Sequence, residues 1–271
     1  MASPNYWVHD LDPFLFQFTE SFGIRYYGLA YALGFLAGMW LLHLFCKHGK
    51  AVLTPEQQSL VITAMMIGVL LGGRLGYMLF YALDDVLHRP WVIFQIWKGG
   101  MASHGGFIGV LVACWWVAKK LKLSFLQLGD LLCPLVPPGI LLGRIANFIN
   151  GELWGKVTSV PWAVIFPQSA QLGTPLEQIA ARHPSQLYEA GLEGALLLMY
   201  SQWRLWKTDA LNQPGRLTGE FLMIYAVVRV FGEQFREPDA PLIFDLSRGS
   251  FYSLFLLAGG LYLVLKSRKT A

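Results

Sequence analysis

The stretch "FLQLGDLLCPLVPPGILLGRIANFINGELWG", residues Phe125–Gly155, begins as an apolar run and ends in polar groups. Its apolar part, 125–150, is long enough to cross the hydrocarbon core of a bilayer, which takes about 20 residues as a helix. Helix-breaking residues interrupt the run at Pro134, Pro137, Pro138 and Gly139. A membrane helix tolerates such residues only where neighbouring groups satisfy the freed backbone, so we expect a kink or a break there.

Six further apolar segments are spread along the chain, so the whole sequence is typical of a membrane protein. Of the 271 residues, 55% are hydrophobic and 14% are charged, and the mean hydropathy is +0.45. An ordinary soluble domain has about 25% charged residues. The predicted transmembrane helices are 25–46, 58–83, 103–119, 125–150, 187–206, 218–236 and 251–266. We therefore predict an all-α, polytopic protein of about seven transmembrane helices that forms one integral membrane domain, 1–271.

The distribution of lysine and arginine predicts which way the chain crosses the membrane. Eleven basic residues lie in the loops and the tail on one side, and five lie on the other side. Because basic residues are enriched in cytoplasmic loops, we expect the C-terminus in the cytoplasm and, with seven helices, the N-terminus outside. The segment 151–185, between the fourth and fifth helices, is then a small external head. The segment 84–102 is also external, where Trp91 and Trp97 indicate a helix lying flat in the membrane interface.

The composition also argues against several classes of function. The net charge of +4 is small and is not gathered in one basic block, so nucleic-acid binding is not expected. Cys46, Cys114 and Cys133 lie in or at the ends of apolar segments without a CxxC spacing, so we interpret them as buried thiols. The sequence has no clustered histidines, cysteines or carboxylates at metal-ligand spacing, so we expect no metal and no other cofactor. No basic segment precedes the first apolar run, and a cleavable signal peptide is not expected.

Five arginines lie within or at the edges of the predicted helices, where a charge costs on the order of 3 kcal/mol. These residues are Arg25, Arg74, Arg144, Arg229 and Arg236. On the predicted topology, Arg74, Arg144 and Arg236 reach the outer half of the membrane. Tyr27 and His104 lie near the outer ends of their own helices. Residues that are far apart in the sequence are thus predicted to converge at one depth.

Helical spacing places these arginines on faces shared with other polar residues. Intervals of three or four residues join four sets: Tyr225, Arg229, Glu233 and Arg236; Arg144, Asn147 and Asn150; Arg74, Tyr77 and Tyr81; Glu189 and Glu193. One interpretation is that Glu233 neutralises Arg229 and Arg236 in a buried network. The other is that Arg144 and Arg236 are available to a ligand, because the acids are too few to neutralise every arginine. Guanidinium groups at this depth suit a phospholipid phosphate, which they bind in bidentate fashion.

His104 lies in the glycine-rich stretch "GGMASHGGFIG", residues 99–109. An imidazole titrates near neutrality and can act as a base. The alternative is a structural histidine that bonds to the backbone at the start of a helix. The sequence has no GxSxG motif that would present a nucleophilic serine.

The stretch "GRIANFINGELWG", residues Gly143–Gly155, resembles the signature of the bacterial prolipoprotein diacylglyceryl transferase family, Gly-Arg-x-Gly/Ala-Asn-Phe-x-Asn-x-Glu-x-x-Gly. Every fixed position of that signature is matched. Further family-like stretches occur in order between about residues 25 and 240: "YYGLAY", "LGGRLGY", "MASHGGFIGV", "RHPSQLYE" and "FREPD". One mild departure is Phe107, which stands where leucine is common.

The resemblance implies a reaction and its partners. The diacylglyceryl group of phosphatidylglycerol passes to the thiol of the lipobox cysteine in a prolipoprotein, forming a thioether and releasing glycerol 1-phosphate. This is the first step of bacterial lipoprotein modification and takes place at the cytoplasmic (inner) membrane. The implied partners are phosphatidylglycerol, the lipobox segment and the surrounding membrane lipids.

Resemblance and spacing together suggest roles for individual residues. We expect His104, Arg144 and Arg236 to be catalytic, with His104 as the base and the arginines on the phosphate. Arg236 has a second interpretation, as the group that lowers the pKa of the acceptor thiol. The residues expected to bind phosphatidylglycerol are Arg144, Asn147, Asn150, Glu152, Gly155, Arg236 and Tyr27. The residues expected to form a supporting polar network are Arg74, Tyr77, Glu189, Tyr225, Arg229 and Glu233.

Three other functions fit the pattern less well. A transporter for an anionic lipid would need polar groups across the whole membrane, whereas the costly charges gather in one half. A phosphatidyltransferase of the CDP-alcohol class needs several aspartates on adjacent helix turns, which the sequence lacks. A structural membrane protein would have little reason to bury five arginines.

Overall fold

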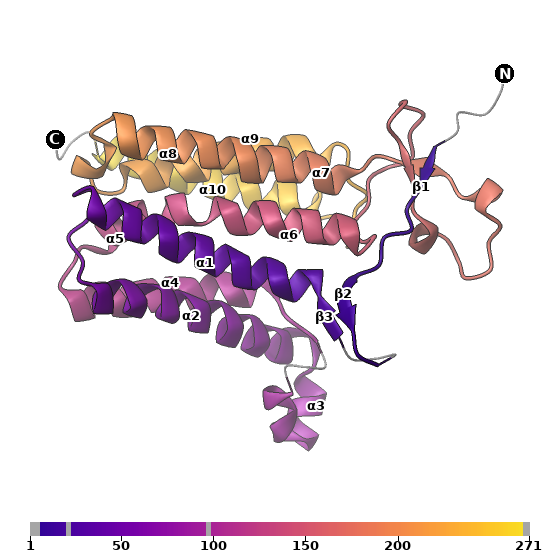
Figure 1. The fold of residues 1–271 in the computed structure, drawn as a ribbon, viewed down its shortest axis with the longest axis horizontal. Helices are drawn as coiled ribbons and strands as arrows, with labels where there is room; N and C mark the ends of the chain where they lie inside the picture. The colour runs from indigo at the N-terminus through magenta and orange to yellow at the C-terminus, as the bar shows by residue number, and fades with distance from the viewer. Residues whose placement is uncertain (1–5, 20–22, 96–98, 268–271) are drawn as a thin grey trace. The chain divides into compact units, whose positions relative to one another are not determined.

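A computed structural model gives the fold and describes residues 6–19, 23–95 and 99–267 (Figure 1). Most of these residues are helical, as predicted. The chain divides into two compact units, one comprising Met39–Leu131 and the other combining Met1–Gly38 with Leu132–Ala271. The first long helix, α1 (Tyr26–Lys47), begins in the second of these units and ends in the first.

Two long helices form the body of the unit Met39–Leu131. Its helices are α2 (Pro55–Tyr81), α3 (Leu83–His88), η1 (Pro90–Phe94), α4 (Ser103–Leu121) and most of α5 (Phe125–Leu132). α2 begins at a capping box, in which the Thr54 hydroxyl accepts from the Gln57 N–H and the Gln57 side chain accepts from the Thr54 N–H. Two orphan donors at the helix start are thereby satisfied.

Glycines set the close approach of α2 to α4, which run side by side in Figure 1. A β-carbon added to Gly76 of α2 would lie 2.7 Å from the Cα of Gly105 of α4. One added to Gly68 of α2 would lie 2.7 Å from the carbonyl oxygen of Gly109. Both distances are too short for a real side chain, so the spacing of the two helices requires glycine. The glycines around His104 therefore have a packing role.

The other unit is a bundle of helices that carries a small β-structured head. Its helices are α6 (Pro137–Ile149), α7 (Ser185–Glu189), the π-helical segment η6 (Ala190–Leu196), α8 (Leu197–Lys207), α9 (Arg216–Glu233) and α10 (Arg248–Ser267), with short turns at η3 (Cys133–Leu135), η4 (Pro167–Ser169), η5 (Leu176–Gln178) and η7 (Ala210–Asn212). α7, η6 and α8 follow one another without a gap and form one helix with a widened turn. In that turn, a β-carbon on Gly194 would lie 2.7 Å from the Cα of Leu141, so η6 packs closely on α6.

The prediction of an all-α chain is corrected by two small sheets. β1 (Trp7–Val8) pairs in parallel with β4 (Val164–Ile165), and β4 pairs antiparallel with β5 (Ala181–Arg182). β2 (Phe14–Gln17) pairs antiparallel with β3 (Gly23–Arg25). Strands of only two to four residues are too short to show a period of two, which is why the sequence did not reveal them. β4 and β5 lie within the segment predicted to be an external head.

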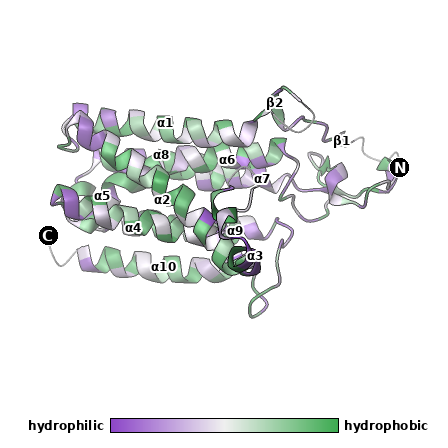
Figure 2. Cartoon of the chain, turned by 90° about the horizontal axis from the view of Figure 1, so that it is seen from below, coloured by the Kyte–Doolittle hydropathy of each residue, from purple (hydrophilic) through white to green (hydrophobic). Residues whose placement is uncertain are grey.

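Among the described residues, three helices, α1, α2 and α10, are long and apolar enough to cross a membrane. A fourth span is obtained when Phe125–Leu135 and Pro137–Ile149 are taken together, with a bend of 41° at the break between them. This break confirms the interruption predicted at the prolines. α9 falls short of this standard because four of its 18 residues are charged. Figure 2 shows apolar residues along most turns of the long helices. The part of the protein that the structure describes is thus mostly helical with three or four candidate spans, and seven spans remain a prediction.

The segment predicted to lie flat in the interface, 84–102, contains two short helices, α3 and η1. Trp91 lies in η1 and its side chain is 59% exposed. Trp97 lies outside the residues that the structure describes.

Candidate functional site

Two buried glutamates form the centre of a network of ion pairs. Glu189 ends α7, Glu193 follows one turn later in η6, and both are 0% exposed. Arg144 of α6 binds both, with Nη1 2.9 Å from Glu189 Oε2 and Nη2 2.8 Å from Glu193 Oε2. Arg229 of α9 binds the same pair, with Nη1 2.8 Å from Glu189 Oε1 and 3.0 Å from Glu193 Oε1. Arginines from two other helices therefore hold the glutamates in place.

Further ion pairs extend the network to Arg236. One interpretation of the sequence paired Glu233 with both Arg229 and Arg236. Glu233 pairs with Nη2 of Arg229, whereas Arg236 pairs with Glu189 and Asp239. Arg236 lies three residues beyond the end of α9 and is 5% exposed. Its Nη1 lies 3.2 Å from Glu189 Oε1, and its Nη2 lies 2.8 Å from Asp239 Oδ2. Because the Asp239 side chain is 59% exposed, this contact lies at the rim of the network.

The network is close to electroneutral, which corrects the expectation that the acids are too few. Arg144, Arg229 and Arg236 face three buried glutamates and one aspartate at the rim. Spacing within single helices could not reveal this balance, because Glu189 contacts arginines from three different places in the sequence. Leaving one buried charge without its partner costs about 3–5 kcal/mol, so the pairs are strongly coupled to the fold.

A glycine at the start of α10 makes room for the pair formed by Arg229 and Glu233. A β-carbon on Gly249 would lie 2.8 Å from Glu233 Cδ and 2.9 Å from Arg229 Nε. Tyr225 precedes Arg229 by one turn on α9, as its spacing predicts, and its ring stacks on Phe221 with centroids 6.5 Å apart. The first turn of α10 therefore covers the polar face of α9 at Arg229 and Glu233.

A second polar cluster lies at the end of α6. Asn147 and Asn150 both donate from Nδ2 to the same oxygen, Glu152 Oε1, at 2.8 and 3.3 Å. Gln186 donates from Nε2 to the Glu152 carbonyl oxygen at 2.6 Å. The Oδ1 atom of Asn150 is buried and accepts no hydrogen bond from the residues that the structure describes. Buried polar atoms are normally satisfied, so this oxygen is an acceptor that a ligand hydroxyl can use.

Gly155 ties the signature stretch to the segment that carries Arg236. The Gly155 N–H donates to the His183 carbonyl at 2.9 Å, and the Lys156 N–H donates to the Phe235 carbonyl at 2.8 Å. A β-carbon on Gly155 would lie 2.5 Å from both of these carbonyl oxygens. The structure thus gives Gly155 a backbone role, in which it permits the pairing that holds Arg236 in position.

The compact unit Met39–Leu131 contains three other predicted site residues. His104 lies in the first turn of α4 with an exposed side chain. Arg74 is 3% exposed, and Tyr77 follows it on α2 and lies against the loop at Gly100. Arg74 donates to the backbone carbonyls of Val92, Ile93, Gln95, Gly99 and Gly100. The network predicted around Arg74 is therefore a backbone cap for the loop that precedes α4.

Two other predicted residues lie near the N-terminus. Tyr27 is half-buried in the first turn of α1, with its ring 5.4 Å from that of Tyr31. Arg25 was counted among the helix arginines, but it ends β3 and lies over the Phe14 ring at 4.6 Å.

Two members of the network, Glu193 and Asp239, were not among the predicted site residues. Glu193 lies four residues after Glu189, and this spacing already placed it on the same polar face. Asp239 lies three residues after Arg236, a spacing that indicates an ion pair. This spacing was not considered because the predicted helix ended at Arg236. In the part of the chain that the structure describes, no group of three or more His, Cys, Asp or Glu residues could hold a metal ion.

Apolar helices of membrane-spanning length and a buried network of arginines and glutamates define a helical membrane protein with a polar site inside it. Residues 13–266 match the family model described as prolipoprotein diacylglyceryl transferase, and the chain belongs to this family. The resemblance inferred from the signature is thereby confirmed.

Curated relatives cover nearly the whole chain. The phosphatidylglycerol–prolipoprotein diacylglyceryl transferase of Cereibacter sphaeroides is 42% identical over 286 residues, covering 97% of this chain and 98% of that protein. The protein of the same name from Legionella pneumophila is 43% identical over 260 residues, covering 94% and 96%. That of Ruegeria pomeroyi is 41% identical over 284 residues, covering 96% of both chains.

Proposed function

We propose that this protein transfers the diacylglyceryl group of phosphatidylglycerol to the lipobox cysteine of prolipoproteins, the first step of bacterial lipoprotein modification. Membership of the family and the names of the relatives support this function. The structural observation that supports it most directly is the buried network that joins Arg144 to Arg236 through Glu189. Two guanidinium groups held in one low-dielectric site suit a substrate with a phosphate diester.

The reaction exchanges a carbon–oxygen bond for a carbon–sulfur bond. The cysteine thiolate attacks the glycerol carbon that bears the phosphate ester, and the bond from that carbon to the ester oxygen breaks. The electron pair leaves with glycerol 1-phosphate. A free cysteine thiol has a pKa of about 8.5, so it is mostly protonated at neutral pH and needs a base. The thiol proton passes to His104.

Arg236 offers the phosphate a place that does not require the buried pairs to break. Its Nη1 holds the buried Glu189, whereas its Nη2 holds Asp239 at the rim. A phosphate oxygen can replace the exposed Asp239 carboxylate on Nη2. Arg144 contributes as well, since three of its five N–H donors contact carboxylates. Within the described residues the other two have no carboxylate partner, and we assign them to the leaving group.

The glycerol head group of the lipid fits the acceptor on Asn150. The hydrogen bond from Asn150 Nδ2 to Glu152 fixes the amide so that Oδ1 is the free atom. Asn147 donates to the same carboxylate oxygen and steadies it. A head-group hydroxyl would donate to Asn150 Oδ1, and we propose Tyr27 as a further contact with the lipid.

The proposed setting is the bacterial inner membrane, with about seven spans and the site in the half nearer the outer leaflet. The N-terminus and the head, 151–185, would lie outside, and the C-terminus would lie in the cytoplasm. The excess of eleven basic residues over five supports this orientation.

Transfer from phosphatidylglycerol to a lipobox peptide in detergent tests the proposed roles. Arg144→Ala and His104→Gln should each lower the rate by about 10²–10³-fold, the usual effect of removing one essential group from a dry site. Lys156→Gln is the control, because Lys156 is exposed and directly follows the signature stretch. Near-normal turnover in Arg144→Ala and His104→Gln would rule out their catalytic assignment.

A further inference from the structure

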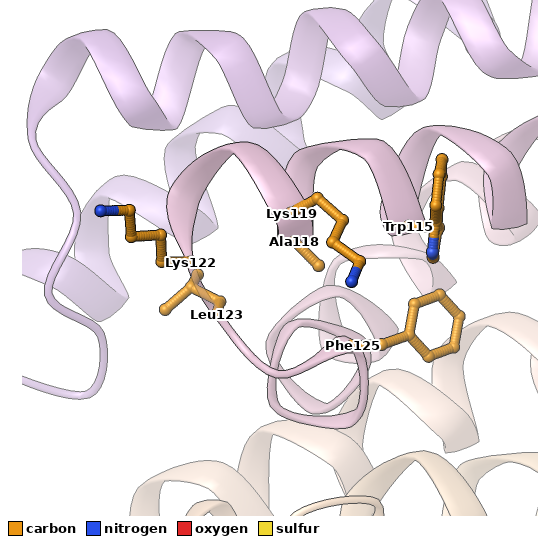
Figure 3. Close-up of a pocket in the computed structure, with 6 residues that line it drawn as sticks. All are labelled: Trp115, Ala118, Lys119, Lys122, Leu123 and Phe125. Atoms are coloured by element: carbon orange, nitrogen blue, oxygen red, sulfur yellow. The ribbon is translucent and has the colours of Figure 1, made fainter.

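A cavity of about 520 Å³ opens at the end of α4, where the chain turns into α5 (Figure 3). The residues that line it are Trp115, Ala118, Lys119, Lys122, Leu123 and Phe125. All of them belong to the compact unit Met39–Leu131, and none takes part in the network of arginines and glutamates.

Hydrogen-bond donors and aromatic rings meet in this cavity. In Figure 3, the ammonium of Lys119 and the indole nitrogen of Trp115 both point toward the side on which the ring of Phe125 lies. Trp115 is 55% exposed and Phe125 is 40% exposed. Lys119 and Lys122 form none of the ion pairs found in the described part of the chain. Neither charge is therefore neutralised by an acid within these residues, and in Figure 3 the Lys119 ammonium points toward Trp115 and Phe125, whereas that of Lys122 points away from them.

The turn that forms one wall of the cavity holds a lysine in a backbone conformation that favours glycine. Lys122 has a φ of 55°, in the left-handed region. Its N–H donates to the Lys119 carbonyl at 3.3 Å, and the Leu123 N–H donates to the Ala118 carbonyl at 2.9 Å. A glycine would close the helix with the same bonds and less strain, so the turn alone does not account for a lysine here.

We propose that this cavity binds the phosphate head group of an anionic phospholipid from the surrounding membrane. The Lys119 ammonium pairs with the phosphate, and the Trp115 indole N–H donates to it. The rings of Trp115 and Phe125 pack at the boundary between head group and acyl chains, where aromatic residues are enriched. The positive charge selects an anionic lipid over a zwitterionic one. On the proposed orientation this end of α4 faces the cytoplasm, so the lipid belongs to the inner leaflet.

Native mass spectrometry of the full-length protein in detergent tests this site, with phosphatidylglycerol as the anionic probe and phosphatidylethanolamine as the zwitterionic one. Wild type should retain phosphatidylglycerol in preference, and Lys119→Gln should weaken that retention about fivefold. Lys120→Gln is the matched control. It removes the same charge one residue away, where the ammonium lies 4.9 Å from the Trp116 ring centroid and outside the cavity. Binding of the lipid elsewhere on the protein is common to all variants and cancels in the comparison.

A second variant separates lipid binding from folding. Lys122→Gly should raise Tm, because it relieves the turn, and should still weaken the retention of phosphatidylglycerol at least about twofold. Equal retention by Lys119→Gln and Lys120→Gln would overturn the proposal, because the lysines would then act only as interfacial charges. Equal retention of the two lipids by wild type would overturn it as well.

Discussion

Glu193 is buried between two arginines from neighbouring helices, at 2.8 Å from Arg144 and 3.0 Å from Arg229. The substitution Glu193→Gln removes the carboxylate that Arg144 and Arg229 share, so each of these two guanidinium groups loses a buried charged partner. We expect it to lower the free energy of unfolding by on the order of 3 kcal/mol. Glu237→Gln is the control, because Glu237 pairs with Arg182 at 3.1 Å but has a 48% exposed side chain. Glu237→Gln should lower the free energy of unfolding by less than about 1 kcal/mol. Equilibrium unfolding in detergent measures the free energy of unfolding of both variants. An equal decrease in Glu193→Gln and Glu237→Gln would contradict the conclusion that burial makes the Glu193 pairs important.

Asp239 occupies the Nη2 group of Arg236 that we assign to the lipid phosphate. Asp239→Asn removes a competing negative charge, so KM for phosphatidylglycerol should fall by about threefold while kcat stays unchanged. Steady-state kinetics with a lipobox peptide in excess measure the effect. Asp245→Asn serves as the control, because Asp245 is also exposed and takes part in none of the ion pairs within the described residues. A rise in KM would show that Asp239 helps to bind the lipid instead of competing with it.

At the scale of single residues, the sequence predicted which charged side chains are costly to bury in the membrane, but not which of them form ion pairs with one another. Charges inside apolar helices identified Arg144 and Arg229, and intervals of three and four grouped each with its own helix face. Such intervals say nothing about which face meets which. The position of Glu189 between three arginines depends on helices far apart in the sequence, so only the structure could reveal it.

The connection from β5 to α7 contains a histidine whose protonation should destabilise the head. Burial lowers the pKa of His183 from its ordinary value. The ring packs edge-on against Tyr188 and Phe235, with centroids 5.8 and 5.2 Å apart. Because the unfolded chain binds the proton more tightly, this contribution to stability is complete above the unfolded pKa of about 6.5 and is lost as the pH falls toward the folded value.

Thermal unfolding between about pH 7.5 and pH 5.5 measures this effect. Tm of the wild type should fall as the pH is lowered, and His183→Gln should make that fall shallower. His48→Gln is the control, because His48 is exposed at the end of α1. The same dependence of Tm on pH in the wild type and in His183→Gln would contradict the assignment.

At the scale of elements, long apolar runs predicted α1, α2 and α10 well, because a membrane-spanning helix needs a long uniform segment. Two features of the secondary structure were not predicted correctly. The strands of the head are two residues long and are specified by distant pairing, as between Trp7 and Val164. The end of α9 was placed at Arg236, but the helix stops at Glu233. Arg236 is instead positioned by backbone pairing with Gly155.

At the scale of the whole molecule, the orientation in the membrane can be tested by labelling single cysteines in a background without the three native ones. Leu172→Cys lies in the head at a fully exposed site, and Lys207→Cys lies at the exposed end of α8. A membrane-impermeant maleimide should label Leu172→Cys in intact spheroplasts, whereas Lys207→Cys should react only after permeabilisation. The opposite pattern would invert the proposed topology.

The family could be identified from sequence because a single contiguous signature, Gly143–Gly155, carries several fixed positions. The division of the chain into two compact units could not be predicted from the sequence. The reason is that α1 and α5 each continue across a boundary between the units without any break in composition.

The most direct test of the central claim is mass spectrometry of a lipobox peptide after incubation with the purified protein and phosphatidylglycerol. We expect a diacylglyceryl adduct on the cysteine, stoichiometric release of glycerol 1-phosphate, and loss of both in Arg144→Ala. Absence of the adduct with wild-type protein, or an equal adduct on a peptide whose cysteine is replaced by serine, would contradict it.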